Sequence, residues 1–586
     1  MEEEVMKKRL RDNFLIGIFF LVIACLYVYL FARTKLIFSA GDMMFHANRM
    51  EELFRDVQHG VLIPRISTYT FNQVGSGINF FYPWIFLYPF VIFRLITGNP
   101  IMAFYLGVIL ETFLTLAIAY YSMHQYSHSK TRSLVFALIY TLANYRLYLV
   151  FNQNVLAESI GYTFVPLVLL GFYEVFFSNQ QKWPLFGIGM TLLIYSHMLT
   201  TALTASFLLL TFLIFLPVIQ GKGKRLLSAV KAAGLSLALT AFFLVPFFEQ
   251  TLTNHLRASW KGFNYVALPM HVIENSLNNA PWQVIGFVLL LTLTFGFLGL
   301  KHAPAVEKFS YFSGLVLVLL TTTLFPWDKL LGTPIANLQF PYRLNGLATV
   351  MLSIYLSLLI EQAIRFLQSH YHVSSYLSIF VILAGLMCLT VSASEQIISW
   401  RSSDLMIDKR PTVNNYYLQN KNVNGCYNLR RNNWQNQFYY YGHNGAFDYF
   451  PVNIKADGQL ITSIVTHHAL VDGRKVNLTS RLTSKPNAIR YDLSGLKAGS
   501  TVQLPILFYH NDVVKIGNSD YRKPMVSNST TVVVKVPQTH KQVTVKYQDS
   551  LLDVISVLVS VLAWLVVAAS YLYRKLHRRK DYERIS

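Results

Sequence analysis

The chain has 586 residues, of which 53% are hydrophobic and only 13% are charged, and its formal net charge is +21. Soluble domains carry about 25% charged residues, so this composition excludes an ordinary soluble globular protein. In so apolar a chain the positive charge is typical of the cytoplasmic loops of a membrane protein, and it gives no reason to predict nucleic-acid binding.

Apolar runs occupy most of residues 14–394. Runs of about 20 residues are long enough to cross a hydrocarbon core of about 30 Å. Basic residues cluster before the first run, in alternate loops and after the last run, which places both termini in the cytoplasm. The pattern predicts twelve membrane spans, near residues 14–32, 101–121, 133–150, 161–177, 184–197, 199–219, 226–245, 283–300, 309–325, 344–362, 376–394 and 551–573.

One apolar segment, residues 82–97, is left out of this count. It contains Pro83, Pro89 and Arg94, and it is short. Counting it as a span would invert all later loops and place the basic clusters outside the cell. We therefore predict a segment that dips into the membrane or lies at its surface, and the open alternative is a true span with a missed partner elsewhere.

Residues 395–550 are hydrophilic and contain alternating, strand-like runs, with turn signals such as Asp472-Gly473 between them. This pattern predicts a β-sandwich at the non-cytoplasmic membrane surface. The predicted fold is therefore an α-helical polytopic membrane protein with one extracytoplasmic, mainly-β domain. Its parts are a transmembrane domain over 1–394 with a long first outer loop at 33–100, the β-domain over 395–550, and a final span with a basic cytoplasmic tail over 551–586.

The first outer loop begins with an amphipathic helical pattern. Its polar face carries Asp42, His46, Arg49, Glu52, Asp56 and His59. The plain interpretation is a helix along the membrane interface with its polar face toward water, ended by Gly60. Asp42 differs from the other residues because it lies where the first span emerges. Partial desolvation there raises the pKa of a carboxyl group, which suits a general base, and His46 is one turn away.

Three further polar residues lie at predicted outer ends of spans, where polar groups are costly and often functional. Glu158 is the only charge of the second outer loop, and it is either an ordinary loop acid or a functional group. His197 lies in a tight outer turn, where it either binds a phosphate or sugar or is a structural group. Arg343 opens a span, which suits the phosphate of a lipid-linked donor and equally suits snorkelling to the interface.

Two short motifs carry a resemblance to known families, Gly-Asp-x-x-Phe-His-x-x-Arg at 41–49 and Gln-Phe-Pro-Tyr-Arg at 339–343. With the order of spans, loop helix and β-domain, they resemble the GT-C superfamily of glycosyltransferases. Within it they resemble the bacterial YfhO-like proteins and the membrane family named 6-pyruvoyl-tetrahydropterin synthase-related. The resemblance implies catalytic roles for Asp42, His46 and Glu158, and substrate binding by Arg49, His197, Gln339, Tyr342 and Arg343. It also implies that Glu158, as a second acid of the site, positions the acceptor or a metal.

The leading hypothesis is a multi-pass cell-membrane glycosyltransferase of GT-C type that inverts the anomeric carbon. It moves a sugar from a polyprenyl-phosphate donor to an extracytoplasmic cell-envelope acceptor, with teichoic acid as an example by analogy alone. The alternative is a transporter or flippase of lipid-linked glycan or cell-wall precursor, which needs midplane polar groups such as Glu111. A third hypothesis is a glycan-binding surface protein anchored by its spans. The predicted partners are the lipid-linked donor, the acceptor and membrane lipid. The sequence has no zinc-ligand spacing, and a divalent cation is left open as a cofactor.

Overall fold

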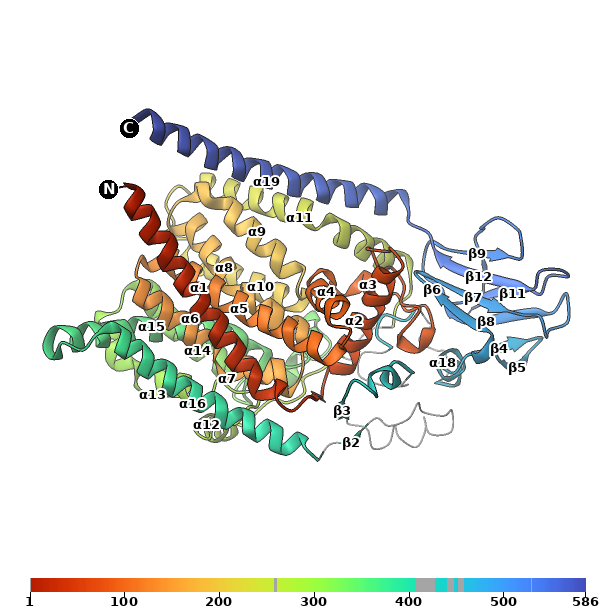
Figure 1. Cartoon of the computed structure of the whole chain (residues 1–586), viewed down its shortest axis with the longest axis horizontal. Coiled ribbons are helices and arrows are strands. Elements are labelled where there is room, and N and C mark those ends of the chain that lie inside the picture. The colour runs from red at the N-terminus through yellow and green to blue at the C-terminus, as the bar shows by residue number, and fades with distance from the viewer. Residues whose placement is uncertain are drawn as a thin grey trace.

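The computed structural model describes residues 2–257, 261–403, 405–406, 427–439, 447–451, 458–528 and 530–585. A bundle of helices makes up one end of the molecule and two large β-sheets make up the other (Figure 1). Both chain termini lie at the end of the bundle that is away from the sheets (Figure 1). The termini and the sheets are therefore at opposite ends, as the charge pattern predicts, and the side that faces the cytoplasm stays a prediction.

Among the described residues, eight helices are long and apolar enough to cross a membrane. They are α1 (Glu2–Ala32), α5 (Pro100–Ser127), α8 (Leu156–Phe177), α10 (Met198–Phe215), α11 (Lys222–Thr253), α15 (Leu344–Tyr371), α16 (Ser375–Arg401) and α19 (Leu551–Ile585). A ninth span results if α6 (Lys130–Thr141) is joined to the helical segment Asn144–Asn152, from which it is bent by 42°.

The predicted count of twelve spans is not confirmed, and the difference lies in three short helices. The predicted spans at 184–197, 283–300 and 309–325 correspond to α9 (Trp183–Ile194), α13 (Phe287–Phe295) and α14 (Ala305–Leu320). A 12-residue helix such as α9 is about 18 Å long, whereas the hydrocarbon core is about 30 Å thick. The predicted non-span at 82–97 contains α4 (Tyr88–Thr97), whose 10 residues are also too few to cross the membrane.

The chain becomes irregular after α6. It breaks at Leu142, resumes as α7 (Asn144–Leu147) and continues into a π-helix, η3 (Tyr148–Asn152). π-helical turns are rare in proteins, and those that occur often lie at functional sites. Here the irregular stretch buries Tyr145 and Tyr148 at the sheet-side ends of α8 and α15, where the candidate site lies.

The two large sheets pack face to face as a β-sandwich. One sheet has the order β10-β11-β8-β4-β5 and the other β6-β7-β12-β9, and all neighbouring strands are antiparallel. The strands are β4 (His468–Val471), β5 (Arg474–Asn477), β6 (Leu482–Lys485), β7 (Ala488–Asp492), β8 (Thr501–Leu507), β9 (Asp512–Ile516), β10 (Met525–Val526), β11 (Thr531–Lys535) and β12 (Gln542–Tyr547). Alternate residues of β12 are buried, as expected for a strand with one covered face. Both sheets contribute to one apolar core that includes Ile489, Val502 and Val545, so the predicted fold class, a helical membrane protein with a mainly-β part, is confirmed.

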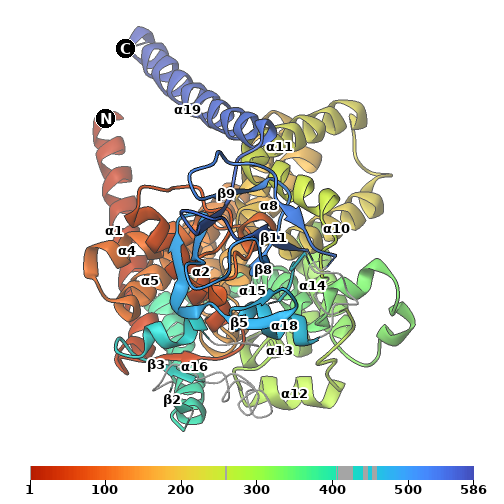
Figure 2. The same ribbon diagram turned by 90° about the vertical axis from the view of Figure 1, so that its right-hand side faces the viewer.

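The helix of the first predicted outer loop is α2 (Met43–Gln58), and it ends as predicted because Gly60 follows with a φ of +81°. The prediction that its polar face points to water is wrong, since His46, Glu52 and Asp56 are buried. The physical reason is non-local packing. The loop at 60–82 folds back over α2, and the β-sandwich covers that loop in turn, so that the strands lie in front of α2 when the molecule is viewed from the sheet end (Figure 2).

Candidate active site

The N-terminal end of α2 is fixed to the loop that follows η3. The backbone N–H of Asp42 donates to the Gln153 carbonyl at 3.1 Å, and that of Ala40 donates to Asn154 Oδ1 at 3.1 Å. Gly41 lies between them with a φ of +46°, and a Cβ at this position would lie 2.3 Å from the Gln153 carbonyl oxygen. Only glycine tolerates both this backbone and this approach, which gives the Gly-Asp pair of the sequence motif a structural reason.

Asp42 is a half-buried acid without a hydrogen bond from its carboxyl group to any described residue. Burial raises the pKa of Asp42 to about 6, the nearby Arg343 guanidinium lowers it, and the carboxylates of Glu158 and Asp448 raise it. A carboxyl group with this pKa is mostly ionised at neutral pH and still accepts a proton readily. The raised pKa agrees with the sequence-based expectation for a general base.

His46, Arg49 and His197 surround the ring of Tyr82. The rings of His46 and His197 lie 6.0 and 5.9 Å from the Tyr82 ring, and the Arg49 guanidinium lies 4.6 Å over it. Arg49 donates to the carbonyls of Tyr82 at 3.1 Å and of Pro83 at 2.5 Å, so it holds the backbone at this turn. Burial, then the charge of Arg49, keeps the pKa of His46 well below its ordinary value, so the imidazole is neutral.

His197 is the N-cap of α10. Its Nδ1 lies 2.8 Å from Thr200 Oγ1 and accepts the Thr200 backbone N–H at 3.4 Å. Its Nε2 makes no hydrogen bond to a described residue, so this atom is available to a ligand.

Glu158 and Arg343 form a buried ion pair. The Arg343 Nε lies 3.3 Å from Glu158 Oε2, and the Tyr145 hydroxyl donates to Glu158 Oε1 at 2.7 Å. Arg343 Nη1 donates to the Leu338 carbonyl at 2.9 Å and to Gln339 Oε1 at 3.2 Å. The side chain of Arg343 is only 11% exposed, so it does not snorkel to the surface. Its Nη2 has no hydrogen-bond partner in the part of the chain that the structure describes.

The predicted site residues thus gather in two adjoining groups. Asp42, His46, Arg49 and His197 surround Tyr82, while Glu158, Gln339 and Tyr342 surround Arg343. The charges of Glu158 and Arg343 act on the pKa of Asp42, so the two groups interact electrostatically. Their roles in binding or catalysis stay predictions.

Sequence reasoning missed Tyr82, Tyr145 and Asp448. Tyr82 opens the aromatic-proline segment, and that motif was a usable signal. Tyr145 precedes a π-helix that no simple pattern predicts. Asp448 comes from the distant 447–451 segment, which is attached by stacking of Tyr449 on Phe81 at 4.9 Å.

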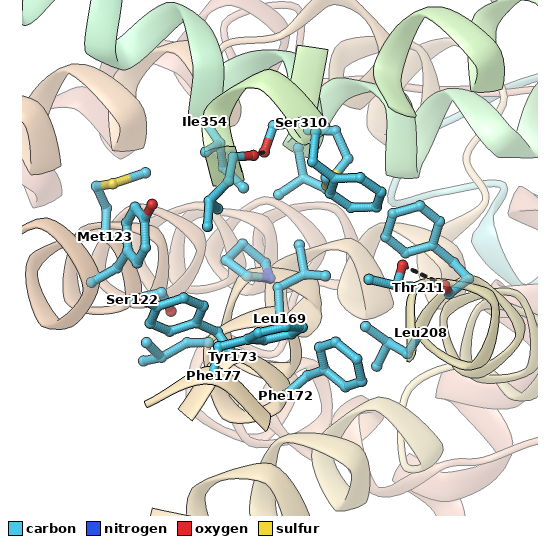
Figure 3. Close-up of a pocket in the computed structure, with 18 of the residues that line it drawn as sticks. Ser122, Met123, Leu169, Phe172, Tyr173, Phe177, Leu208, Thr211, Ser310 and Ile354 are labelled. Carbon is cyan, nitrogen blue, oxygen red and sulfur yellow. Dashed lines mark hydrogen bonds between the residues drawn. The ribbon is translucent and has the colours of Figure 1, made fainter. Parts of the chain in front are cut away.

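Two cavities lie end to end below the Glu158–Arg343 pair. The first measures about 20 Å³ and is lined by that pair. The second measures about 310 Å³, is lined almost wholly by apolar side chains, and lies between α5, α8, α10, α14 and α15 (Figure 3). On three helices the lining passes from the first cavity to the second within one turn, from Val165 to Pro166, from Thr204 to Phe207 and from Leu347 to Val350. The linings of these two separate cavities therefore adjoin along three helices, and the larger, apolar cavity lies deeper in the bundle.

No group of three or more His, Cys, Asp or Glu side chains in the described ranges is arranged to hold a metal ion. Of the acids of the site, Glu158 is instead partnered by Tyr145 and Arg343, and the Asp42 carboxyl group has no hydrogen-bond partner among the described residues.

Fold and site together define a polytopic membrane protein with a polar site at the sheet-side ends of its helices. The model of the family described as "6-pyruvoyl-tetrahydropterin synthase related domain; membrane protein" matches residues 79–403, more than half of the chain. The chain belongs to this family, as the motifs predict. No curated protein matches the sequence.

Several solved structures share part of the fold at low identity. The arabinofuranosyltransferase AftD from Mycobacteria is 14% identical with a TM-score of 0.41, over 66% of this chain and 26% of AftD. ArnT from Cupriavidus metallidurans, solved with undecaprenyl phosphate, is 12% identical with a TM-score of 0.39, over 66% of this chain and 78% of ArnT. The oligosaccharyltransferase AglB from Archaeoglobus fulgidus, solved with an inhibitory peptide and a dolichol-phosphate, is 13% identical with a TM-score of 0.35, over 65% of this chain and 56% of AglB. The chain thus spans about a quarter of AftD and just over half of AglB.

Proposed function

We propose that the protein is a membrane glycosyltransferase that moves a sugar from a polyprenyl-phosphate carrier to an acceptor hydroxyl at the cell envelope. One observation carries the proposal: the Asp42 carboxyl group, which has no hydrogen-bond partner among the described residues, lies near the largely buried Arg343, and Arg343 lines a small cavity beside a larger apolar one. In this proposal residues 1–394 form the catalytic membrane domain, and the β-domain at 395–550 covers it on the extracytoplasmic side. The weak structural similarities add nothing to this argument.

The reaction assigned to the site is a direct displacement. The acceptor oxygen forms a bond to the anomeric carbon of the sugar as the bond from that carbon to the phosphate oxygen breaks. The acceptor proton passes to the Asp42 carboxylate, and polyprenyl phosphate leaves with the bonding electrons. Attack from the face opposite the leaving group inverts the anomeric carbon.

Arg343 is assigned to the phosphate of the donor. Its Nε and Nη1 are held by Glu158, Leu338 and Gln339, and this orients the guanidinium while Nη2 stays available for a phosphate oxygen. A charge-assisted hydrogen bond from a fixed arginine stabilises the negative charge that develops on the leaving group. The two cavities below it suit the apolar chain of the carrier.

The neutral His46 and the Nε2 of His197 lie beside Asp42 and Tyr82 and are assigned to hydroxyl groups of the sugar or acceptor. Arg49 is assigned a structural part, because it holds the carbonyls of Tyr82 and Pro83.

The transport alternative gains no support from the described residues. Glu111, the midplane charge that favoured it, pairs with Arg146 at 3.4 Å and accepts a hydrogen bond from Ser159. Both members of this pair are buried, so their charges compensate each other within the bundle.

The test replaces Asp42→Asn in the full chain and measures sugars released from envelope polymers of cells that contain only the variant. Loss of a general base lowers the rate about 10²–10⁴-fold, so the variant is expected to match cells that lack the protein. The control is Asp56→Asn, the same change on the same helix, at an acid whose two side-chain oxygens make no hydrogen bond to described residues. At equal membrane levels, undiminished sugar transfer by Asp42→Asn would overturn the proposal.

A further inference from the structure

The loop that covers α2 contains an unusual turn. Phe71, Asn72 and Gln73 have φ angles of 49°, 57° and 55°, so three consecutive residues with side chains adopt the left-handed conformation. L-residues avoid this region because Cβ approaches the neighbouring carbonyl oxygen. Such backbone persists only where the surrounding structure holds it, and it concentrates at functional sites.

From one side, the turn is held by α2. The Glu52 carboxylate accepts the backbone N–H groups of residues 68, 69 and 70 at 2.6, 3.0 and 2.8 Å. One helical turn earlier, Asn48 Oδ1 accepts the N–H of Phe71 at 2.8 Å. Both side chains of α2 are buried, so the helix that carries Asp42 and His46 also fixes the start of the turn.

From the other side, the turn is held by the β-sandwich. His467, just before β4, donates from Nε2 to the carbonyl of Asn72 at 2.6 Å, and its side chain is buried. Gln73 Nε2 donates to Ser484 Oγ at 2.9 Å, and the Leu507 N–H donates to the Val74 carbonyl at 2.9 Å. The His467 hydrogen bond ends on the carbonyl of the middle residue of the turn.

The turn contacts the candidate site through the ring of Phe71. The Phe71 ring lies 5.8 Å from the Phe45 ring, which in turn lies 5.3 Å from His46 and 5.2 Å from Tyr82. Phe45 and Phe71 belong to one buried cluster, on which Tyr82 also packs. A shift of the turn therefore moves the ring that packs against both His46 and Tyr82.

We propose that His467 is a positioning residue of the candidate site, which holds the Phe71–Gln73 turn in its left-handed form and thereby places Phe45, His46 and Tyr82. The β-sandwich is then a part of the site's framework and not a separate binding module. Only the kinetic consequence rests on the proposed glycosyl transfer; the structural consequence does not.

The experiment uses the full-length protein in lipid nanodiscs and three variants. His467→Phe keeps a ring but removes the donor, His467→Gln keeps an N–H donor, and the double variant His467→Phe/Asn72→Gly gives the turn a residue that adopts positive φ without strain. The control is His540→Phe, an exposed histidine of the same sandwich.

The first readout is hydrogen exchange, which needs no activity. In His467→Phe, the amides of 43–50 and 68–76 are expected to exchange about tenfold faster, the equivalent of one net hydrogen bond, while the helical bundle and the sandwich core are unchanged. His467→Gln and the double variant are expected to return toward the wild-type rate. Unchanged exchange in His467→Phe, or equally faster exchange throughout the chain, would overturn the inference.

The second readout is sugar transfer. His467→Phe is expected to lower kcat about tenfold without a change in the KM of the lipid-linked donor, because Arg343 lies outside the ring cluster, and the double variant is expected to recover. A raised KM with normal kcat would contradict the inference. If Asp42→Asn still transfers sugar while the His467→Phe exchange pattern is as expected, the proposed function fails and the positioning role stands. If Asp42→Asn is inactive and His467→Phe is normal in both readouts, the positioning role fails alone.

Discussion

Asp56 on α2 is a buried acid whose replacement is expected to stabilise the protein. Its side chain is fully buried and neither carboxyl oxygen has a hydrogen-bond partner among the described residues. Burial and, to a smaller extent, the nearby Glu52 carboxylate together raise the pKa of Asp56 from 3.8 to about 9. At neutral pH the folded protein therefore holds this carboxyl group in its protonated form, whereas the unfolded chain ionises it.

The size of the effect follows from this difference in protonation. A group with a raised folded-state pKa contributes its full stability below its unfolded pKa, near 3.8, and this contribution is lost as the pH rises toward about 9. The loss is about 1.4 kcal/mol per pH unit, or about 4 kcal/mol between pH 4 and pH 7. Asparagine has nearly the same shape and does not titrate, so Asp56→Asn removes this loss.

The assay compares the unfolding free energy of the wild type and of Asp56→Asn in detergent at pH 5, 6, 7 and 8. The variant is expected to gain on the wild type by about 1.4 kcal/mol with each unit of pH. The amide introduced by Asp56→Asn is buried without a partner among the described residues, but its effect on the unfolding free energy does not depend on pH and leaves this slope unchanged. Glu52→Gln is the matched contrast, because the carboxyl oxygens of Glu52 accept the N–H groups of the 68–70 backbone, and the loss of these hydrogen bonds is expected to destabilise the protein. A difference between Asp56→Asn and wild type that stays flat or shrinks as the pH rises would refute the reasoning.

Three further outcomes are expected. Gly41→Ala is expected to destabilise the protein by more than Gly60→Ala. Both glycines have positive φ, so either substitution costs about 1–2 kcal/mol in backbone strain, but only the Cβ at 41 also meets the Gln153 carbonyl. Equal melting temperatures of the two variants would contradict this. Tyr145→Phe removes a hydrogen bond to the buried Glu158, worth about 1.5–3 kcal/mol, and is expected to lower kcat/KM at least tenfold, with wild-type kinetics as the opposing result. Because Asp42 acts in its ionised form and burial raises its pKa to about 6, kcat/KM is expected to rise about tenfold per pH unit below 6 and to level off above it; a profile that is flat down to pH 5 would contradict the assignment of Asp42 as the base.

The sequence was informative where the physics is local. The end of α2 at Gly60 and the helical run after Asp42 follow from backbone preference and periodicity. The span count placed Glu158 and Arg343 at the same predicted face of the membrane, but it did not predict their ion pair. Local signals of this kind survive folding because each depends on only a few neighbouring residues.

The sequence failed where distant segments meet. A run of apolar residues at 184–197 predicts a span, yet α9 ends at Ile194, and hydropathy does not measure where a helix stops. The polar face of α2 predicts exposure to water, yet the 60–82 loop and the β-sandwich cover it. Asp448 reaches the site from a part of the chain hundreds of residues away, and no local pattern marks such an approach.

The acids of α2 show why residue type alone does not assign a role. Asp42, Glu52 and Asp56 lie on one helix within 15 residues and belong to the same polar pattern. The backbone N–H groups that donate to Glu52 oppose the rise in its pKa caused by burial, whereas Asp56 becomes neutral because nothing described donates to it and Glu52 is near. The pKa of Asp42 rises only to about 6, because Arg343 offsets part of the effect of burial. A group whose pKa lies near the working pH is suited to exchange a proton, and the pKa of Asp42 meets this condition.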